Sequence, residues 1–249
     1  MEPGDRVALV LGGSSGLGRG VTLSVASAGY RTAFTYREGG TGPTETLAAL
    51  RERGADALAL QADFAHAGAG REAVEQTEKV FGRLDALVYA VGPMIIRRFE
   101  RFTREDYATM LEANFGGAVD CAHAALPGMR TRGFGRLVFF GMNGSHATLP
   151  SRGLSLYAAA KAAVVAFART LALEEARYGI TVNTVEPGDF RDKNAHREAA
   201  RAIPGKNPTG HAGSWEDVGH AVRFLIADDS GFINGATLGV NGGLVAAHE

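Results

Sequence analysis

The sequence predicts an α/β fold in which an open parallel sheet of about seven strands carries helices on both faces. Short apolar runs alternate with longer helical patterns along all 249 residues, as in sheets whose strands are joined by crossover helices. The runs are continuously apolar, as expected of strands that are covered on both faces. No linker, repeat or low-complexity stretch divides the chain, so we expect residues 1–249 to form a single domain.

The first half of the chain alternates between predicted strands and predicted helices. Each predicted strand is a short run of mostly apolar residues, and these runs lie at residues 6–11, 31–36, 57–61 and 84–90. The segments between them have the apolar spacing of helices, at residues 16–28, 44–53 and 71–81. Glycine follows each of these helices, at the position where it commonly ends one: Gly29, Gly54 and Gly82.

The second half continues the pattern with longer helices. Thr103 and Asp106 have the spacing of a capping box, which predicts a helix near residues 104–113. A longer helix is expected to follow to about residue 129, with Pro127 bending or ending it. The remaining elements are strands at residues 135–141, 180–185 and 236–240, and helices at residues 154–178 and 215–227.

The balance of charges excludes several classes of function. The chain has 26 basic and 27 acidic side chains, so it lacks the basic excess of a general nucleic-acid or anionic-membrane binder. Its seven histidines have no metal-ligand spacing. We therefore expect no nucleic-acid partner, no membrane partner and no metal site.

Cysteine usage and the first residues bear on the compartment. The one cysteine, Cys121, excludes an internal disulfide and fits a reducing environment. The opening residues MEPGDR do not have the pattern of a signal peptide. No apolar run approaches the ~20 residues of a spanning helix. We expect a cytoplasmic protein.

A cluster of glycine and serine residues follows the first predicted strand and opens the first predicted helix, with the spacing Gly12-x-x-x-Gly16-x-Gly18. Glycine at such a junction allows a tight turn, a close approach of the backbone to a pyrophosphate, and close packing of helix on strand. The helix N-terminus adds free N–H groups and a partial positive charge. A bare tight turn is the alternative, but the position favours a phosphate-binding loop in a Rossmann-type doubly wound sheet.

Further motifs follow downstream in the order that they have in one family. Tyr157-Ala-Ala-Ala-Lys161 lies far after the glycine loop, and the other matching positions are Asp63, Asn114 in LEANFGG, Asn183, Pro187-Gly188 and Asn241-Gly242-Gly243. With these motifs the chain resembles the short-chain dehydrogenases/reductases over nearly its whole length, and most of all the beta-ketoacyl carrier-protein reductases. The resemblance implies a single NADP-binding reductase domain that assembles as a homo-oligomer, either a tetramer or a dimer.

The end of the second predicted strand bears on the choice of nicotinamide cofactor. In dinucleotide folds an acidic residue at this place hydrogen-bonds the ribose 2′-hydroxyl of NAD. Here the strand ends in Tyr36-Arg37, with no acid until Glu38. An arginine suits the 2′-phosphate of NADP(H), with Ser14 or Ser15 as further donors, while a solvated arginine at a strand end is the alternative. We expect NADPH as the cofactor.

The glycine loop and the resemblance together define the expected cofactor contacts. The resemblance implies that residues 63 and 64 lie beside adenine, residues 90–92 along the adjoining ribose, and residues 187–190 near the nicotinamide. The expected contacts with NADP(H) are Gly12, Ser14, Ser15, Gly16, Leu17, Gly18, Arg37, Asp63, Phe64, Ala90, Val91, Gly92, Tyr157, Lys161, Pro187, Gly188 and Phe190. The family usually has asparagines where this chain has Tyr89-Ala90, which is expected to weaken an internal hydrogen-bond brace, and often threonine in place of Asp192.

Tyr157 and Lys161 are four residues apart, so on a helix they lie on one face. An ammonium about 4 Å away favours the phenolate by ~1–4 kcal/mol and lowers a tyrosine pKa from ~10 to roughly 7–9. Such a phenol can donate a proton near neutral pH. The resemblance implies that Tyr157 protonates the carbonyl oxygen, Lys161 binds the nicotinamide ribose, and Asn114 holds a water linking Lys161 to solvent. A helix kink or cap is the alternative role of Asn114.

The catalytic serine of the family has no counterpart in register. Counting back from Tyr157 reaches Gly144, whereas counting forward from the fifth predicted strand reaches Met142. Asn143 and Ser145 are nearby donors, but methionine cannot donate, and losing one such donor costs ~10²–10³-fold in rate in other enzymes. We therefore expect a substitute donor, a slower reductase or an altered substrate.

A polar stretch over residues 189–214 resembles the mobile substrate lid of the family, whose closure would exclude water. An exposed loop that contains a helix is the alternative.

Two functions follow from these features. The first is NADPH-dependent reduction of a ketone to a secondary alcohol, with a carrier-protein-linked or CoA-linked 3-oxoacyl thioester or a similar small carbonyl compound as substrate. The second is a regulatory or scaffold relative that binds NADP but is catalytically weak, which the missing serine suggests. Enoyl reduction is a third possibility, although relatives of that type often space tyrosine and lysine more widely.

Overall fold

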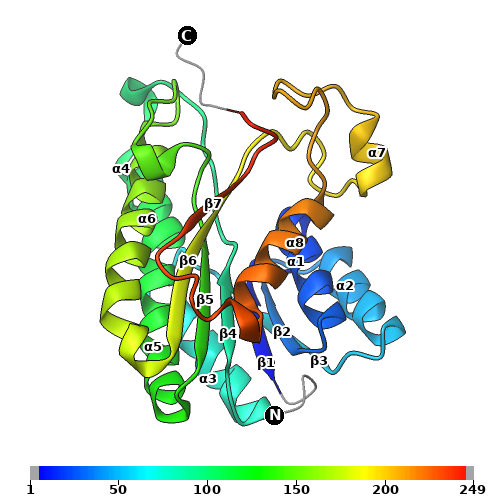
Figure 1. Cartoon of the computed structure of the whole chain (residues 1–249). Helices are drawn as coiled ribbons and strands as arrows, with labels where there is room; N and C mark the ends of the chain where they lie inside the picture. The colour runs from blue at the N-terminus through cyan, green and yellow to red at the C-terminus, as the bar shows by residue number, and fades with distance from the viewer. Residues whose placement is uncertain (1–5, 245–249) are drawn as a thin grey trace.

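A seven-stranded, all-parallel sheet forms the centre of the computed structural model, which describes residues 6–244 (Figure 1). Its order is β3-β2-β1-β4-β5-β6-β7. The strands are β1 (Val7–Leu11), β2 (Arg31–Tyr36), β3 (Ala57–Gln61), β4 (Ala86–Tyr89), β5 (Gly135–Phe140), β6 (Ile180–Pro187) and β7 (Thr237–Val240). The α/β, Rossmann-type doubly wound fold predicted from the sequence is confirmed.

Helices cover both faces of the sheet, and each face has its own hydrophobic core (Figure 1). One layer consists of α1 (Gly16–Ser27), α2 (Thr41–Glu52) and α8 (Trp215–Ile226). The other consists of α3 (Ala69–Phe81), α4 (Arg104–Leu111), α5 (Gly117–Arg132) and α6 (Ser155–Glu175). Successive residues of β1 alternate between the two cores, and all five are fully buried, as the continuous apolar pattern requires.

Several helix ends differ from the prediction. Helix α2 begins at Thr41, three residues before the expected position, because Pro43 is tolerated in a first turn where backbone N–H groups have no helical partner. Pro127 does not end α5, which continues to Arg132 and stops at Gly133 in the left-handed conformation. The capping box of Thr103 and Asp106 is present at the start of α4.

The structure contains a π-helical turn that was not predicted and a short helix that the sequence analysis gave only as an alternative. A π-helical turn, Glu112–Gly116, joins α4 to α5, so that the two predicted helices form one interrupted helix. A short helix, α7 (Arg197–Arg201), lies inside the polar stretch 189–214. Both are too short for an apolar period to reveal them in the sequence.

Helix α6 and the turn after it, Ser155–Tyr178, are long and apolar enough to cross a membrane by length and composition. The sequence analysis expected no such helix. In the fold, α6 packs against β5 and β6 and buries the side chains of Val164, Ala168 and Leu171. It is therefore a partly buried core helix of the domain and not a membrane span.

Cys121 lies at the contact between α5 and α3 and is fully buried. A side chain at Gly70 of α3 would come within 2.7 Å of the Cys121 sulfur, so glycine is what allows the two helices to approach. Burial raises the pKa of the Cys121 thiol far above its usual range.

Candidate functional site

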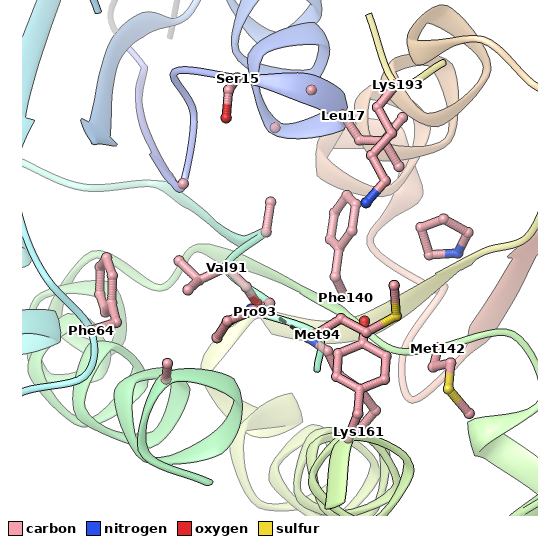
Figure 2. A pocket seen from close by; sticks show the side chains of 18 of the residues that line it. Ser15, Leu17, Phe64, Val91, Pro93, Met94, Phe140, Met142, Lys161 and Lys193 are labelled. Atoms are coloured by element: carbon pink, nitrogen blue, oxygen red, sulfur yellow. Dashed lines mark hydrogen bonds between the residues drawn. The ribbon is translucent and has the colours of Figure 1, made fainter. Parts of the chain in front are cut away.

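A cavity of about 1100 Å³ opens at the carboxyl ends of the strands (Figure 2). It is lined by residues that directly follow or end β1 to β6. In doubly wound sheets, ligands bind at this edge, where the strand order reverses between β1 and β4. Every residue predicted to contact NADP(H) lines this cavity, from the glycine loop to Phe190.

The glycine loop is held in place by β2. The Thr35 side-chain oxygen accepts a hydrogen bond from the Gly12 N–H at 2.8 Å, and the Thr35 carbonyl accepts one from the Gly13 N–H at 2.9 Å. Gly12 has a φ of +76°, which favours glycine, and a side chain at Gly18 would collide with the Gly12 carbonyl. Thr35 also lines the cavity, and the sequence analysis did not identify it.

The N-terminus of α1 faces the cavity, and its own N-cap side chain does not cap it. Ser15 stands at the N-cap position but forms no capping hydrogen bond, and Ser14, Gly16 and Leu17 line the cavity beside it. Free N–H groups at a helix N-terminus form a site for phosphate. The Gly16 N–H binds Oδ1 of Asn194 at 3.1 Å, which brings the segment 189–214 onto the glycine loop.

Arg37 and Asp63 lie at the ends of neighbouring strands on the cavity edge. The Arg37 guanidinium pairs with Glu38 at 3.0 Å, and the two side chains are 63% and 77% exposed. Such an exposed pair is weak, so Arg37 can turn to another anion at little cost. Asp63 accepts a hydrogen bond from the Ala65 N–H at 3.0 Å, which fixes the turn after β3.

Tyr89 supplies a brace where the family usually has asparagine. Its hydroxyl donates a hydrogen bond of 2.7 Å to the Ala113 carbonyl in the π-helical turn. Its ring packs edge to face on Phe64, with centroids 5.5 Å apart. A side chain at Gly117 would collide with the Tyr89 hydroxyl, so the brace also depends on that glycine. Tyr89 thus has hydrogen-bond and ring contacts of its own at this position.

Tyr157 and Lys161 lie on the cavity side of α6, which forms readily because its first turns, SLYAAAKAA, are rich in alanine. Lys161 is 1% exposed, and its ammonium donates to the Val91 carbonyl at 3.1 Å (Figure 2). The Lys161 nitrogen is 5.7 Å from the centre of the Tyr157 ring. The two side chains thus meet the loop after β4 inside the cavity.

The pKa values of this pair differ from the expectation drawn from spacing alone. Burial raises the pKa of Tyr157 to about 12 and lowers the pKa of Lys161 to about 7. The predicted lowering of the tyrosine pKa is not found, because burial removes the water that would stabilise the phenolate. At neutral pH Tyr157 therefore keeps its proton, and Lys161 is close to its titration midpoint.

Asn114 lies in the π-helical turn directly behind the cavity wall and is fully buried. Its amide nitrogen donates to the carbonyls of Pro93 and Met110, both at 3.0 Å. Its Oδ1 has no hydrogen-bond partner among the described residues. A side chain at Gly92 would meet both this oxygen and the Lys161 nitrogen, so the two atoms flank one small space. A buried acceptor in that position is suited to a bridging water.

Ser145 is turned away from the cavity. Its hydroxyl donates to the Glu186 carboxylate at 2.6 Å, and the backbone N–H groups of Gly144 and His146 donate to the same carboxylate at 3.0 and 2.7 Å. Glu186 is the second-last residue of β6 and is buried, so it anchors the loop after β5. Met142 and Asn143 line the cavity, whereas Ser145 does not.

The segment 189–214 is held together by its own hydrogen bonds. The Asp189 carboxylate accepts from the Arg191 guanidinium at 2.6 Å, from the Lys206 N–H, and from the Asn207 amide at 3.1 Å. These contacts lower the pKa of Asp189. Phe190 and Lys193, near the start of the segment, line the cavity.

Met94, Arg152 and Lys193 are among the cavity residues that were not identified from the sequence. Each lies in an irregular segment, where neither apolar period nor motif spacing gives a signal. Among residues 6–244, no three His, Cys, Asp or Glu side chains come together to hold a metal ion.

Comparison with known proteins identifies the family. A family model described as enoyl-(acyl carrier protein) reductase matches residues 12–245. A crystal structure of a short-chain dehydrogenase from Burkholderia cenocepacia in complex with NADP superposes with a TM-score of 0.84 at 32% identity, over 96% of this chain and 97% of that one. The chain belongs to the short-chain dehydrogenase/reductase family.

Other members of the short-chain dehydrogenase/reductase family match over the same extent. Acetoacetyl-CoA reductase of Rhizobium meliloti is 34% identical over 96% of this chain and 98% of its own length. The crystal structure of a 3-oxoacyl (acyl-carrier-protein) reductase from Agrobacterium tumefaciens with NADP bound has a TM-score of 0.86 at 30% identity, covering 96% and 94%. The chain is therefore an oxidoreductase of this family akin to the ketoacyl reductases.

Proposed function

We propose that this short-chain dehydrogenase/reductase uses NADPH to reduce a ketone to a secondary alcohol. One observation carries the proposal: Tyr157 and Lys161 face the same cavity as the glycine loop. A proton donor therefore stands inside a site that is suited to a dinucleotide.

The residues of the cavity fit NADP(H). The glycine loop and the N-terminus of α1 suit the diphosphate, and Arg37 suits a 2′-phosphate. The family structures from Burkholderia cenocepacia and Agrobacterium tumefaciens contain NADP. When bound, the cofactor supplies the hydride that adds to the carbonyl carbon.

The residues of the chain supply the proton. Tyr157 is protonated at neutral pH and can donate to an oxygen that becomes negatively charged, which is the requirement of a reduction. A protonated Lys161 stabilises the phenolate that remains. Asn114, with its free Oδ1 beside Lys161, holds the water through which the proton is replaced from solvent. The segment 189–214 closes over the bound molecules and excludes water.

We propose a 3-oxoacyl thioester, linked to CoA or to a carrier protein, or a similar small carbonyl compound as the substrate. Met94, Met142 and Leu154 give the cavity wall beside Tyr157 an apolar character that suits an acyl chain. Relatives named acetoacetyl-CoA reductase and 3-oxoacyl-[acyl-carrier-protein] reductase support this choice. The name of the matching family model points to enoyl reduction, but the four-residue spacing of Tyr157 and Lys161 favours the ketone.

The decisive experiment follows NADPH oxidation with a panel of 3-oxoacyl-CoA, 3-oxoacyl-carrier-protein and simple ketone substrates. We expect turnover of at least one 3-oxoacyl thioester. Tyr157→Phe should lower kcat by about 10²–10⁴-fold and leave the Kd for NADPH within about twofold, because only proton donation is lost. NADPH binding without oxidation of any substrate would contradict the proposal.

A catalytically weak NADP-binding scaffold is the second candidate. It is favoured by the orientation of Ser145, whose hydroxyl binds Glu186 and is not available to a substrate. In that case Tyr157→Phe would leave the biological role intact while turnover stays low in both proteins.

We further propose that the protein is a cytoplasmic homo-oligomer, a dimer or a tetramer. The single buried cysteine suits a reducing compartment, and the family resemblance supports the assembly.

A further inference from the structure

Lys193 lines the cavity, and the proposed reaction gives it no role. It belongs to the segment 189–214 and extends into the cavity beside Leu17 of α1, on the side away from Lys161 (Figure 2). Four basic side chains line the cavity: Arg37, Arg152, Lys161 and Lys193. Of these, Lys193 is the one that packs on the first turn of α1.

Contacts hold the Lys193 backbone and its side-chain stem against the glycine loop. A Cβ atom at Gly16 would lie 3.4 Å from Cβ and 3.7 Å from Cδ of Lys193, so the stem runs along the loop. The neighbouring residue, Asn194, accepts a hydrogen bond from the Gly16 N–H at 3.1 Å. The segment that carries Lys193 thus lies against the glycine loop, and the side chain extends into the cavity there (Figure 2).

The carboxylates closest in sequence to Lys193 are engaged elsewhere. Asp189 binds Arg191 at 2.6 Å, and Oδ1 of Asp192 accepts from the Asn194 N–H at 2.8 Å. Within residues 6–244, no carboxylate lies within the 4.0 Å of an ion pair with Lys193. The charge of Lys193 is thus available to an anion inside the cavity.

We propose that Lys193 binds the diphosphate of the nicotinamide dinucleotide and so ties the segment 189–214 to the cofactor. This inference rests on the proposed function. The partial charge of a helix N-terminus balances only about half of one negative charge, whereas a dinucleotide diphosphate carries two. Among the other basic side chains of the cavity, Arg37 directly follows β2, Arg152 lies in the loop before α6, and Lys161 is bound to Val91 on the opposite side. Lys193 supplies the missing cation.

The test compares Lys193→Ala, Lys193→Arg and the matched control Lys206→Ala, which removes an exposed lysine of the same segment that does not line the cavity. Dissociation constants of NADPH and of NADH are measured by fluorescence of the bound nucleotide at low and high salt. We expect Lys193→Ala to raise the dissociation constants of both nucleotides by about tenfold or more. It should also reduce the salt dependence of binding. Lys193→Arg should retain most of the affinity, and Lys206→Ala should match the wild type.

If binding of both nucleotides is weakened to the same extent, Lys193 contacts a group that NADPH and NADH share, as the diphosphate is. Selective loss of NADPH would overturn the inference by placing Lys193 on the 2′-phosphate instead. Equal behaviour of Lys193→Ala and Lys206→Ala, with tight binding by the wild type, would overturn the inference alone. Absence of binding of either nucleotide by the wild type would overturn the proposed function as well.

Discussion

Lys161 is buried and has no carboxylate partner among residues 6–244, so its charged form destabilises the folded protein. Its pKa of about 7 in the fold lies well below the 10.5 of an exposed lysine. At ~1.36 kcal/mol per unit of pKa, the native state loses roughly 4–5 kcal/mol when the side chain is protonated in both states. Destabilising side chains of this kind are common in active sites, where function requires a reactive group.

We therefore predict that Lys161→Met stabilises the cofactor-free protein. The unfolded state binds more protons between pH 7 and about 10.5, so wild-type stability rises with pH over that window. The gain in the free energy of unfolding from Lys161→Met should be greatest at pH 7 and below and should vanish near pH 10.5. Denaturant unfolding at several pH values measures this. A gain that is independent of pH would show that packing, and not charge, is responsible.

Arg37 is predicted to set the preference for NADPH over NADH. Because its exposed pair with Glu38 is weak, the guanidinium can bind a 2′-phosphate. Arg37→Ala should raise the Kd for NADPH by about 10–100-fold and leave the Kd for NADH unchanged. Titration of both nucleotides measures the ratio, with the exposed Arg53→Ala as control. Better binding of NADH than of NADPH by the wild type would disprove this role of Arg37.

At the scale of elements, the π-helical turn Glu112–Gly116 is what presents Asn114 to the cavity wall. The turn interrupts one long helix, and Tyr89 binds the Ala113 carbonyl inside it at 2.7 Å. Such turns are frequent at functional sites, because they redirect a side chain without ending the helix. We therefore predict that Tyr89 is a positioning residue for Asn114.

Tyr89→Phe should leave the Ala113 carbonyl buried without its partner and cost about 1–3 kcal/mol of unfolding free energy. The ring and its contact with Phe64 are retained. Because Asn114 loses its support, we expect kcat to fall while the Kd for NADPH stays unchanged. Tyr178→Phe removes an exposed hydroxyl that binds Arg177 and is the matched control. Equal effects of the two substitutions on kcat would contradict a positioning role.

The strand β1 and the helix α6 were predictable from the sequence. Their buried positions are occupied by apolar residues, as a continuous run in β1 and at helical spacing in α6. The π-helical turn was not, since neither composition nor period distinguishes it from α-helix. Ser145 shows the same limit at a loop. Its proximity to Met142 in sequence made it a candidate donor, and only the long-range contact with Glu186 shows where its hydroxyl points.

At the scale of the whole molecule, apolar side chains lie exposed at the β7 edge of the sheet. Phe232 is fully exposed and Phe224 of α8 is 52% exposed, and β7 pairs only with β6 among the described residues. On another surface, Leu173 of α6 is 83% exposed. Exposed aromatic residues beside an open sheet edge are typical of subunit interfaces.

We predict a solution mass above the 26.1 kDa of one chain. Phe224→Glu with Phe232→Glu should lower it by separating copies that meet at the β7 edge, and Leu173→Glu should do so at α6. Light scattering coupled to size exclusion measures each mass. A monomeric wild type would contradict the prediction, and circular dichroism shows whether the variants keep the fold.

The residues that line the cavity were largely predictable from the sequence, but their pKa values were not. The order of the motifs predicted that the glycine loop, Tyr157 and Lys161 line one cavity. The physical reason is that the carboxyl ends of parallel strands share one edge of the sheet. The pKa of Tyr157 depends on how much protein surrounds the phenol, and no spacing in the sequence contains that quantity.

Because Cys121 is buried between α3 and α5, the folded protein is suited to site-specific labelling with a fluorescent dye. A maleimide dye attacks thiolate, and this sulfur is neither ionised nor reachable. A cysteine introduced at an exposed position of α7, such as Glu198→Cys, would take up the dye alone. The emission of that dye would then report, in a single protein and in real time, whether the segment 189–214 moves when a nucleotide arrives.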